Sequence, residues 1–131
     1  MDTRDNLLKS LRGESIGTVN SQSSAEEKFQ NQTLRPILKL QNDLFIQVFI
    51  NYAVKQKNVF FDYSPEKKIA YIEHALQRDM KFRNALKGII IGLFTIDEFN
   101  QYIQNSSNLN KRMINMLIER LKSQVQIIAQ T

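Results

Sequence analysis

The sequence predicts an all-α protein, a compact bundle of five or six helices around one long central helix, with no sheet. The first observation is composition: 131 residues with 42% hydrophobic and 24% charged residues are typical of one soluble globular domain. The second is periodicity, because apolar residues recur at spacings of three and four along several segments. The third is that the only β-prone run, 59–63, has no second strand candidate to pair with.

The central helix is predicted over residues 33–57, which read TLRPILKLQNDLFIQVFINYAVKQK. Its apolar residues surround most of the helix, and a helix of this kind is usually buried on several sides. Pro36 interrupts the register, because proline has no N–H and its ring crowds the preceding turn. Either Thr33 caps a new helix there or one helix kinks at the proline.

The N-terminal region is predicted to be less ordered than the rest. Residues 3–12 favour a short helix with leucines 7, 8 and 11 on one side, which Gly13 ends. The run that follows is rich in serine and glycine and buries little, so it cannot offset its ordering entropy. We therefore expect a flexible arm and linker over 1–24 and a single helical domain over 25–131, beginning at the capping-box spacing Ser24–Glu27.

Two helix starts follow the central helix. Ser64, Pro65 and Glu66 combine an N-cap oxygen, a first-position proline and a first-turn acid. The apolar pattern then bends at 79–81, which leaves open whether one helix or two cover the segment to residue 93. Ala85, Gly88 and Gly92 fall on one flank, where missing side chains are expected to let another helix approach closely.

The absence of certain residue types narrows the function classes. The chain has no cysteine, so disulfides and thiolate chemistry are excluded. Its one histidine, His74, is expected on the surface, and no cofactor, metal ligand set or catalytic residue is predicted. No apolar run approaches the roughly 20 residues of a membrane helix and the N-terminus lacks a signal-peptide pattern, so we expect a cytoplasmic protein without a membrane partner.

Three segments of the sequence resemble other proteins: FQNQTLRPILKLQNDLFIQVF, KFRNALKGIIIG and YIQNSSNLNKRM. In them the chain resembles a group of small uncharacterised all-helical bacterial proteins, over most of its length after the linker. Some members of that group carry an automatic glyoxalase label. Glyoxalases bind a divalent metal through several His and Glu residues, whereas this sequence has one histidine and no such motif. The resemblance therefore implies a bacterial protein and transfers no site residue.

Three polar residues fall within predicted apolar arcs. Arg120 and Gln124 lie one turn apart in the last helix, predicted over about 107–129, and Gln41 has a similar position on the central helix. Buried polar groups need partners, so the three form either an internal network or the lining of a small ligand pocket.

A helix-turn-helix interpretation rests on the order of a short helix, a turn and a long helix. The short helix begins at the capping box Thr95–Glu98, and residues 105–108 have turn chemistry. The nucleic-acid-binding candidates on the polar face, within 96–122, are Asn110, Lys111, Arg112, Asn115 and Lys122. Glu119 lies in that face, and a net charge of +5 makes no concentrated basic stripe.

A surplus of apolar surface on the central and C-terminal helices favours a protein-interaction module, with a homodimer as one form, because exposed apolar patches mark partner sites. A well-filled monomeric core explains the same residues. Nucleic-acid binding is the alternative function. Small-ligand binding or an enzyme ranks below it, so the sequence leans against an enzyme.

Overall fold

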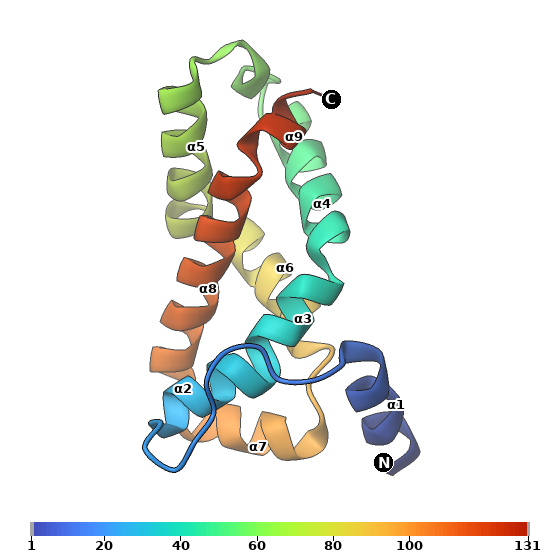
Figure 1. Cartoon of the computed structure of the whole chain (residues 1–131). Helices are drawn as coiled ribbons and strands as arrows, with labels where there is room; N and C mark the ends of the chain where they lie inside the picture. The colour runs from blue at the N-terminus through green and yellow to red at the C-terminus, as the bar shows by residue number, and fades with distance from the viewer. Residues whose placement is uncertain (1, 131) are drawn as a thin grey trace. The chain divides into compact units, whose positions relative to one another are not determined.

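The computed structural model describes residues 2–130, and every regular element among them is a helix (Figure 1). The all-α fold class without a sheet is thereby confirmed for this part of the chain. The chain divides into two compact units. Unit 1 comprises Met1–Leu40 and Lys87–Met113, and unit 2 comprises Gln41–Leu86 and Ile114–Thr131. The division predicted at residue 24, and the flexibility of the residues before it, stay predictions.

Unit 1 is built from short helices around an aromatic centre. Its elements are α1 (Asp2–Arg12), α2 (Ala25–Phe29), the π-helix η1 (Gln30–Leu34), α3 (Arg35–Leu40), the end of α6 (Met80–Ile91), α7 (Ile96–Gln104) and the start of α8 (Ser106–Ser123). Phe94 is the central ring, with its centroid 5.4 Å from that of Phe29 and 5.7 Å from that of Tyr102. All three side chains are buried, so this cluster joins α2 to α7.

The helix around Pro36 continues without interruption from α2 through η1 into α3. Thr33 lies inside the π-helix, so the alternative in which it caps a new helix is wrong. Ser24 does begin the stretch, since its side chain accepts a hydrogen bond from the backbone of Glu27. Pro36 has no N–H for the carbonyl of Gln32, four residues earlier. That carbonyl accepts a hydrogen bond from Arg12 instead, at 3.4 Å.

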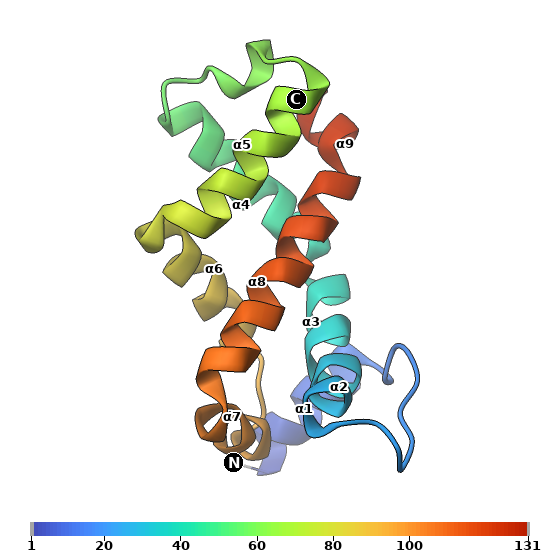
Figure 2. The ribbon, with the colours of Figure 1, turned by 90° about the vertical axis from the view of Figure 1, so that its left-hand side faces the viewer.

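Unit 2 packs its helices on a larger set of rings. Its elements are α4 (Asn42–Lys55), the 3₁₀ turn η2 (Phe60–Asp62), α5 (Pro65–Arg78), the start of α6, the end of α8 and α9 (Val125–Ala129). Phe49 is fully buried, with ring centroids 5.3 Å from Phe60 and 6.1 Å from Tyr71. The turn η2 thus places Phe60 in the core, and α9 lies beside α5 (Figure 2).

The stretch expected as one central helix, 33–57, is divided at Gln41, whose φ of −93° and ψ of 8° are not helical. The helix α4 then ends at Lys55, and Lys57 and Asn58 both have left-handed backbone, with φ of 66° and 57°. The bend predicted near residue 79 separates α5 from α6 at Asp79. Residues 65–91 therefore form two helices.

The structure confirms one of the roles predicted for the glycines and contradicts another. Gly13 closes α1 with a left-handed φ of 81°, as expected. The close helix approach expected at Gly88 and Gly92 is wrong, because a Cβ built on Gly88 has no neighbour within 4 Å. Gly92 follows the end of α6, and the atoms nearest to a Cβ built there are carbonyl oxygens of that helix, at 3.1 Å and 3.8 Å. Within residues 2–130, no helix has both the length and the apolar character that crossing a bilayer requires.

Candidate functional site: the buried ion pair of unit 1

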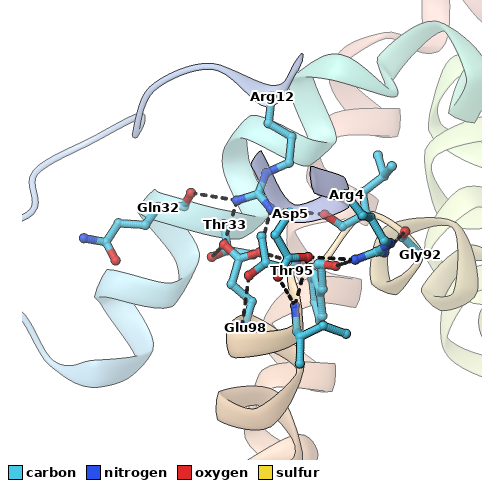
Figure 3. A network of polar contacts seen from close by, with 11 residues as sticks. Arg4, Asp5, Arg12, Gln32, Thr33, Gly92, Thr95 and Glu98 are labelled. Atoms are coloured by element: carbon cyan, nitrogen blue, oxygen red, sulfur yellow. Dashed lines mark hydrogen bonds and ion pairs between the residues drawn. The ribbon is translucent and has the colours of Figure 1, made fainter. Parts of the chain in front are cut away.

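A buried ion pair joins the last residue of α1 to the first turn of α7 (Figure 3). The guanidinium of Arg12 donates from Nη1 to Oε1 of Glu98 at 2.5 Å and from Nη2 to Oε2 at 2.7 Å. Only 4% of the Arg12 side chain and 11% of the Glu98 side chain are exposed. The two-point geometry fixes both side chains, because the planar guanidinium matches the carboxylate.

The Glu98 carboxylate has two further donors. Thr33 Oγ1 of η1 donates to Oε2 at 2.6 Å, and the backbone N–H of Thr95 donates to Oε1 at 2.8 Å. The Thr95 hydroxyl accepts in return from the N–H of Glu98, so the predicted capping box is confirmed. Each carboxylate oxygen thus accepts two hydrogen bonds, and no lone pair is left for a general base.

Arg12 also binds the backbone of unit 1. Its Nη1 donates to the carbonyl of Leu93 at 3.1 Å, in addition to the longer bond from Nη2 to Gln32. Among the residues that the structure describes, its Nε has no hydrogen-bond partner, and this atom is buried. One side chain therefore ties α1 to η1, to α7 and to the loop that precedes α7.

The environment keeps Glu98 ionised. Burial alone would raise the pKa of this carboxyl, but the hydrogen bonds from Arg12, Thr33 and Thr95 outweigh burial, and the pKa is lowered from its ordinary value. A carboxylate with this set of donors favours its charged form. The pair is therefore charged at neutral pH, and its hydrogen bonds join α1, η1 and α7.

Two more residues of α1 contact the loop before α7. Arg4 donates to the carbonyls of Phe94 at 2.9 Å and Gly92 at 3.1 Å. Asp5 accepts from the first N–H of α7, that of Ile96, at 3.2 Å. The face of α1 that packs thus carries Asp5 and Arg12, and Leu7 and Leu11 are exposed. The polar residues pack here because the carbonyls and N–H groups of the loop need polar partners.

An open cleft of about 640 Å³ lies over the ion pair. Its lining outside the network includes Lys9, Glu14, Ser15, Asp97 and Gln101. The cleft offers charged and amide groups, with no nucleophile held by a base. His74 is exposed on α5, and no three His, Asp or Glu side chains within residues 2–130 gather as a metal would require.

The predicted polar trio is brought together in part. Arg120 and Gln124 meet in unit 2, where both donate to Oδ1 of Asn42, at 3.2 Å and 2.7 Å. The amide of Asn42 donates to Oε1 of Gln124 at 2.7 Å. Gln41 makes no side-chain bond as the N-cap of α4, because the break there lets the next residue, Asn42, take the position in the network. Burial lowers the pKa of Arg120, which has no acidic partner among the described residues.

The candidates for nucleic-acid binding are mostly occupied. Arg112 pairs with Glu26 at 3.1 Å, and Lys122 pairs with Glu73 at 3.0 Å. Asn110 accepts from the Tyr102 hydroxyl at 2.6 Å, whereas Lys111 and Asn115 are exposed. The turn between α7 and α8 is Asn105 alone, shorter than the three or four residues of a helix-turn-helix.

Sequence reasoning missed Arg12, Thr33 and Asn42. Arg12 falls in the segment expected to be flexible, and Glu98 is fully explained by its capping box. A usable signal did exist, since Asp5, Leu8 and Arg12 share one face of α1 at helical spacing.

A comparison with protein family models, with curated proteins and with solved structures finds no match for this chain.

Proposed function

We propose that the protein is a self-associating interaction module whose contact surface lies on α1 and α7. The observation that carries this proposal is a set of large apolar side chains on these two helices, each between 39% and 66% exposed. We call this set the apolar edge, and its members are Leu7, Leu11, Ile96, Phe99 and Ile103. Exposed apolar side chains grouped on neighbouring elements are characteristic of partner sites.

The spacing of the apolar edge suits helix packing. Leu7 and Leu11 are one turn apart on α1, and Ile96, Phe99 and Ile103 follow the i, i+3, i+7 pattern on α7. Residues at these spacings project from one side of a helix and are the anchors of helix-in-groove contacts. Each of the two helices therefore presents one stripe for a neighbouring helix to cover.

The residues beside the stripes favour a second copy as the partner. Three exposed neighbours on the same sides of the helices are uncharged, namely Thr3, Ser10 and Asn100. The charged neighbour is Arg4, whose guanidinium donates to the backbone carbonyls of Phe94 and Gly92. A two-fold contact brings identical surfaces together, so charged neighbours of one sign would repel one another. The mostly neutral surroundings of the stripes keep that cost small.

The buried ion pair supports the same proposal. Because Arg12 and Glu98 fix α1 against α7, the two stripes are held before a partner arrives. Preorganisation of this kind lowers the entropy lost on association. On the central and C-terminal helices, where the sequence predicts surplus apolar surface, some large apolar side chains are buried and others are exposed. Phe45, Phe49 and Leu117 are buried, whereas Leu44, Val54 and Ile127 are exposed.

Light scattering after size-exclusion chromatography tests the proposal. The wild-type protein is expected at twice the monomer mass of 15.3 kDa, and the double variant Leu7→Ser with Phe99→Ser at the monomer mass. The matched control is Met80→Ser with Ile127→Ser, which removes apolar side chains of similar exposure outside the apolar edge. Circular dichroism checks that both variants fold. A wild-type monomer at every concentration, or a control that dissociates equally, overturns the proposal.

A further inference from the structure

A second hollow lies wholly within unit 2 and plays no part in the proposed self-association. Its volume is about 430 Å³, within the range of small-molecule sites. One wall is a face of α4, and the other is the corner between α5 and α6. The lining residues from α4 and its end are Val48, Asn51, Tyr52, Lys55 and Gln56, and those from the corner are Asp79, Lys81, Phe82 and Ala85.

The base of this hollow is aromatic and apolar. The rings of Tyr52 and Phe82 are stacked, with centroids 3.8 Å apart and planes 16° from parallel. Val48 and Ala85 add aliphatic surface on either helix. A flat ring or short aliphatic group can gain contact area here without displacing a polar partner.

Asp79 fixes the base. Its Oδ2 accepts from the Tyr52 hydroxyl at 2.8 Å, and its Oδ1 accepts from the N–H of Phe82 at 3.1 Å. Both ring-bearing residues are therefore held by one carboxylate. Burial and this bond raise the pKa of Tyr52, while the bond from Tyr52 lowers the pKa of Asp79, so the hydroxyl stays protonated and the carboxylate ionised at neutral pH. The carboxylate already caps α6, so an incoming anion has to use other donors.

The donors that remain available to an anion lie at the rim of the hollow. Lys55 and Lys81 are exposed, they come from different walls, and neither forms an ion pair within residues 2–130. Asn51 and Gln56 add exposed amide groups. Two ammonium groups and one engaged carboxylate give the rim an excess of positive charge, which attracts anions.

The backbone beside the rim is unusual. Directly after Gln56, the non-glycine residues Lys57 and Asn58 both have left-handed φ. A left-handed non-glycine residue costs about 1 kcal/mol or more, and such residues cluster at ligand-binding segments. This turn therefore directly follows a residue that lines the hollow.

We propose that this hollow binds a small organic anion: a carboxylate or phosphate group bonded by Lys55 and Lys81, carrying a flat apolar body that packs on Tyr52 and Phe82. The rings of Tyr52 and Phe82 favour ligands with an apolar body, and the two lysines favour ligands with a negative charge. A ligand that has only the apolar body or only the charge contacts only one part of the site.

NMR titration of the full chain with phenyl phosphate tests the proposal, with inorganic phosphate and phenol as the two half-ligands. Phenyl phosphate is expected to shift amide signals of residues 48–56 and 79–85. It should bind more tightly than either half-ligand. The variant Lys55→Gln with Lys81→Gln is expected to weaken binding about fivefold or more, from the loss of two partly exposed charge contacts.

The matched control is Lys39→Gln with Lys111→Gln, which removes the same charge from exposed lysines outside the hollow. It is expected to leave the affinity unchanged. Equal weakening in the control, shifts centred elsewhere, or phosphate binding as tightly as phenyl phosphate overturns the proposal. The variant Leu7→Ser with Phe99→Ser keeps the hollow intact, so its binding of phenyl phosphate separates this inference from the proposed self-association.

Discussion

The two units place a carboxylate in opposite settings. In unit 1 the Glu98 carboxylate is buried against a guanidinium and has four donors. In unit 2 the Asp79 carboxylate lies near the surface and is bonded by a tyrosine whose ring is stacked in an aromatic cluster. The first is a charged centre that holds several segments of backbone. The second is a polar group added to packing that rings already supply.

This difference predicts how each unit depends on single groups. A buried charge that loses its partner is very unfavourable, because the remaining ion is neither solvated nor paired. A half-buried hydrogen bond that is lost can be replaced by water. Unit 1 should therefore be sensitive to one carboxylate, and unit 2 should tolerate the loss of its tyrosine hydroxyl.

The largest expected effect is that of Glu98→Gln. The amide keeps the shape of the side chain but leaves the Arg12 guanidinium buried without a counter-charge, so the free energy of unfolding should fall by about 3–5 kcal/mol. Urea unfolding followed by circular dichroism measures it. Asp97→Asn, at the exposed neighbour, is the control and should change the stability by no more than about 0.5 kcal/mol.

A double variant, Arg12→Met with Glu98→Met, sharpens this comparison. Removing both charges leaves no unpaired ion, so the double variant should be more stable than Glu98→Gln. Equal destabilisation by the two variants would show that packing volume, and not charge, holds α1 in place.

The second prediction uses pH to separate the two settings. The pKa of Glu98 is lowered from 4.5, so its stabilising effect is present above that pH and is lost as the pH falls through the lower, folded-state pKa. The pKa of Tyr52 is raised from 10.0, mainly by burial, so its effect is present below that pH and is lost as the pH rises above it. Acid should weaken the first centre and alkali the second.

Urea unfolding at a series of pH values checks the prediction through variant differences. The stability difference between wild type and Glu98→Gln should shrink below pH 4.5, and that between wild type and Tyr52→Phe should shrink above pH 10.0. Asp79 also loses stabilisation in acid, since the Tyr52 bond lowers its pKa. Tyr52→Phe also removes this bond, so its stability difference should shrink in acid as well as in alkali, whereas that of Glu98→Gln should shrink in acid alone.

Local patterns in the sequence predict the helical class and most helix starts. The N-caps Ser24, Ser64 and Thr95 all accept the expected backbone hydrogen bonds. Such signals involve residues three apart in sequence, so they can be seen without a fold.

Contacts between distant residues could not be predicted in the same way. Arg12 and Glu98 are 86 positions apart, and the residues around each of them do not indicate that the other is its partner. The break at Gln41 has the same consequence, because a helical wheel drawn through 33–57 assumes a register that the chain does not keep. The wheel then points to Gln41 where the structure uses Asn42.

The third prediction concerns Tyr52→Phe alone. The ring still stacks on Phe82, and only the hydroxyl that donates to Asp79 is lost. The free energy of unfolding should fall by about 1 kcal/mol, because the bond is to a charged group but is only half buried. The matched control is Tyr63→Phe, which also removes one tyrosine hydroxyl but lies outside this contact. A loss as large as that of Glu98→Gln would erase the contrast between the two units.

The smallest expected effect is a gain in stability. Gly88 lies within α6 and a Cβ there has no neighbour within 4 Å, so Gly88→Ala should raise the free energy of unfolding by about 0.5–1 kcal/mol through helix propensity. Gly92 follows the end of α6, and the added Cβ comes within 3.1 Å of the Gly88 carbonyl, so Gly92→Ala should not raise the stability. Thermal unfolding of both variants measures the difference. A loss at Gly88 would mean that a partner approaches this face of α6, which would place a contact surface of unit 1 away from the apolar edge.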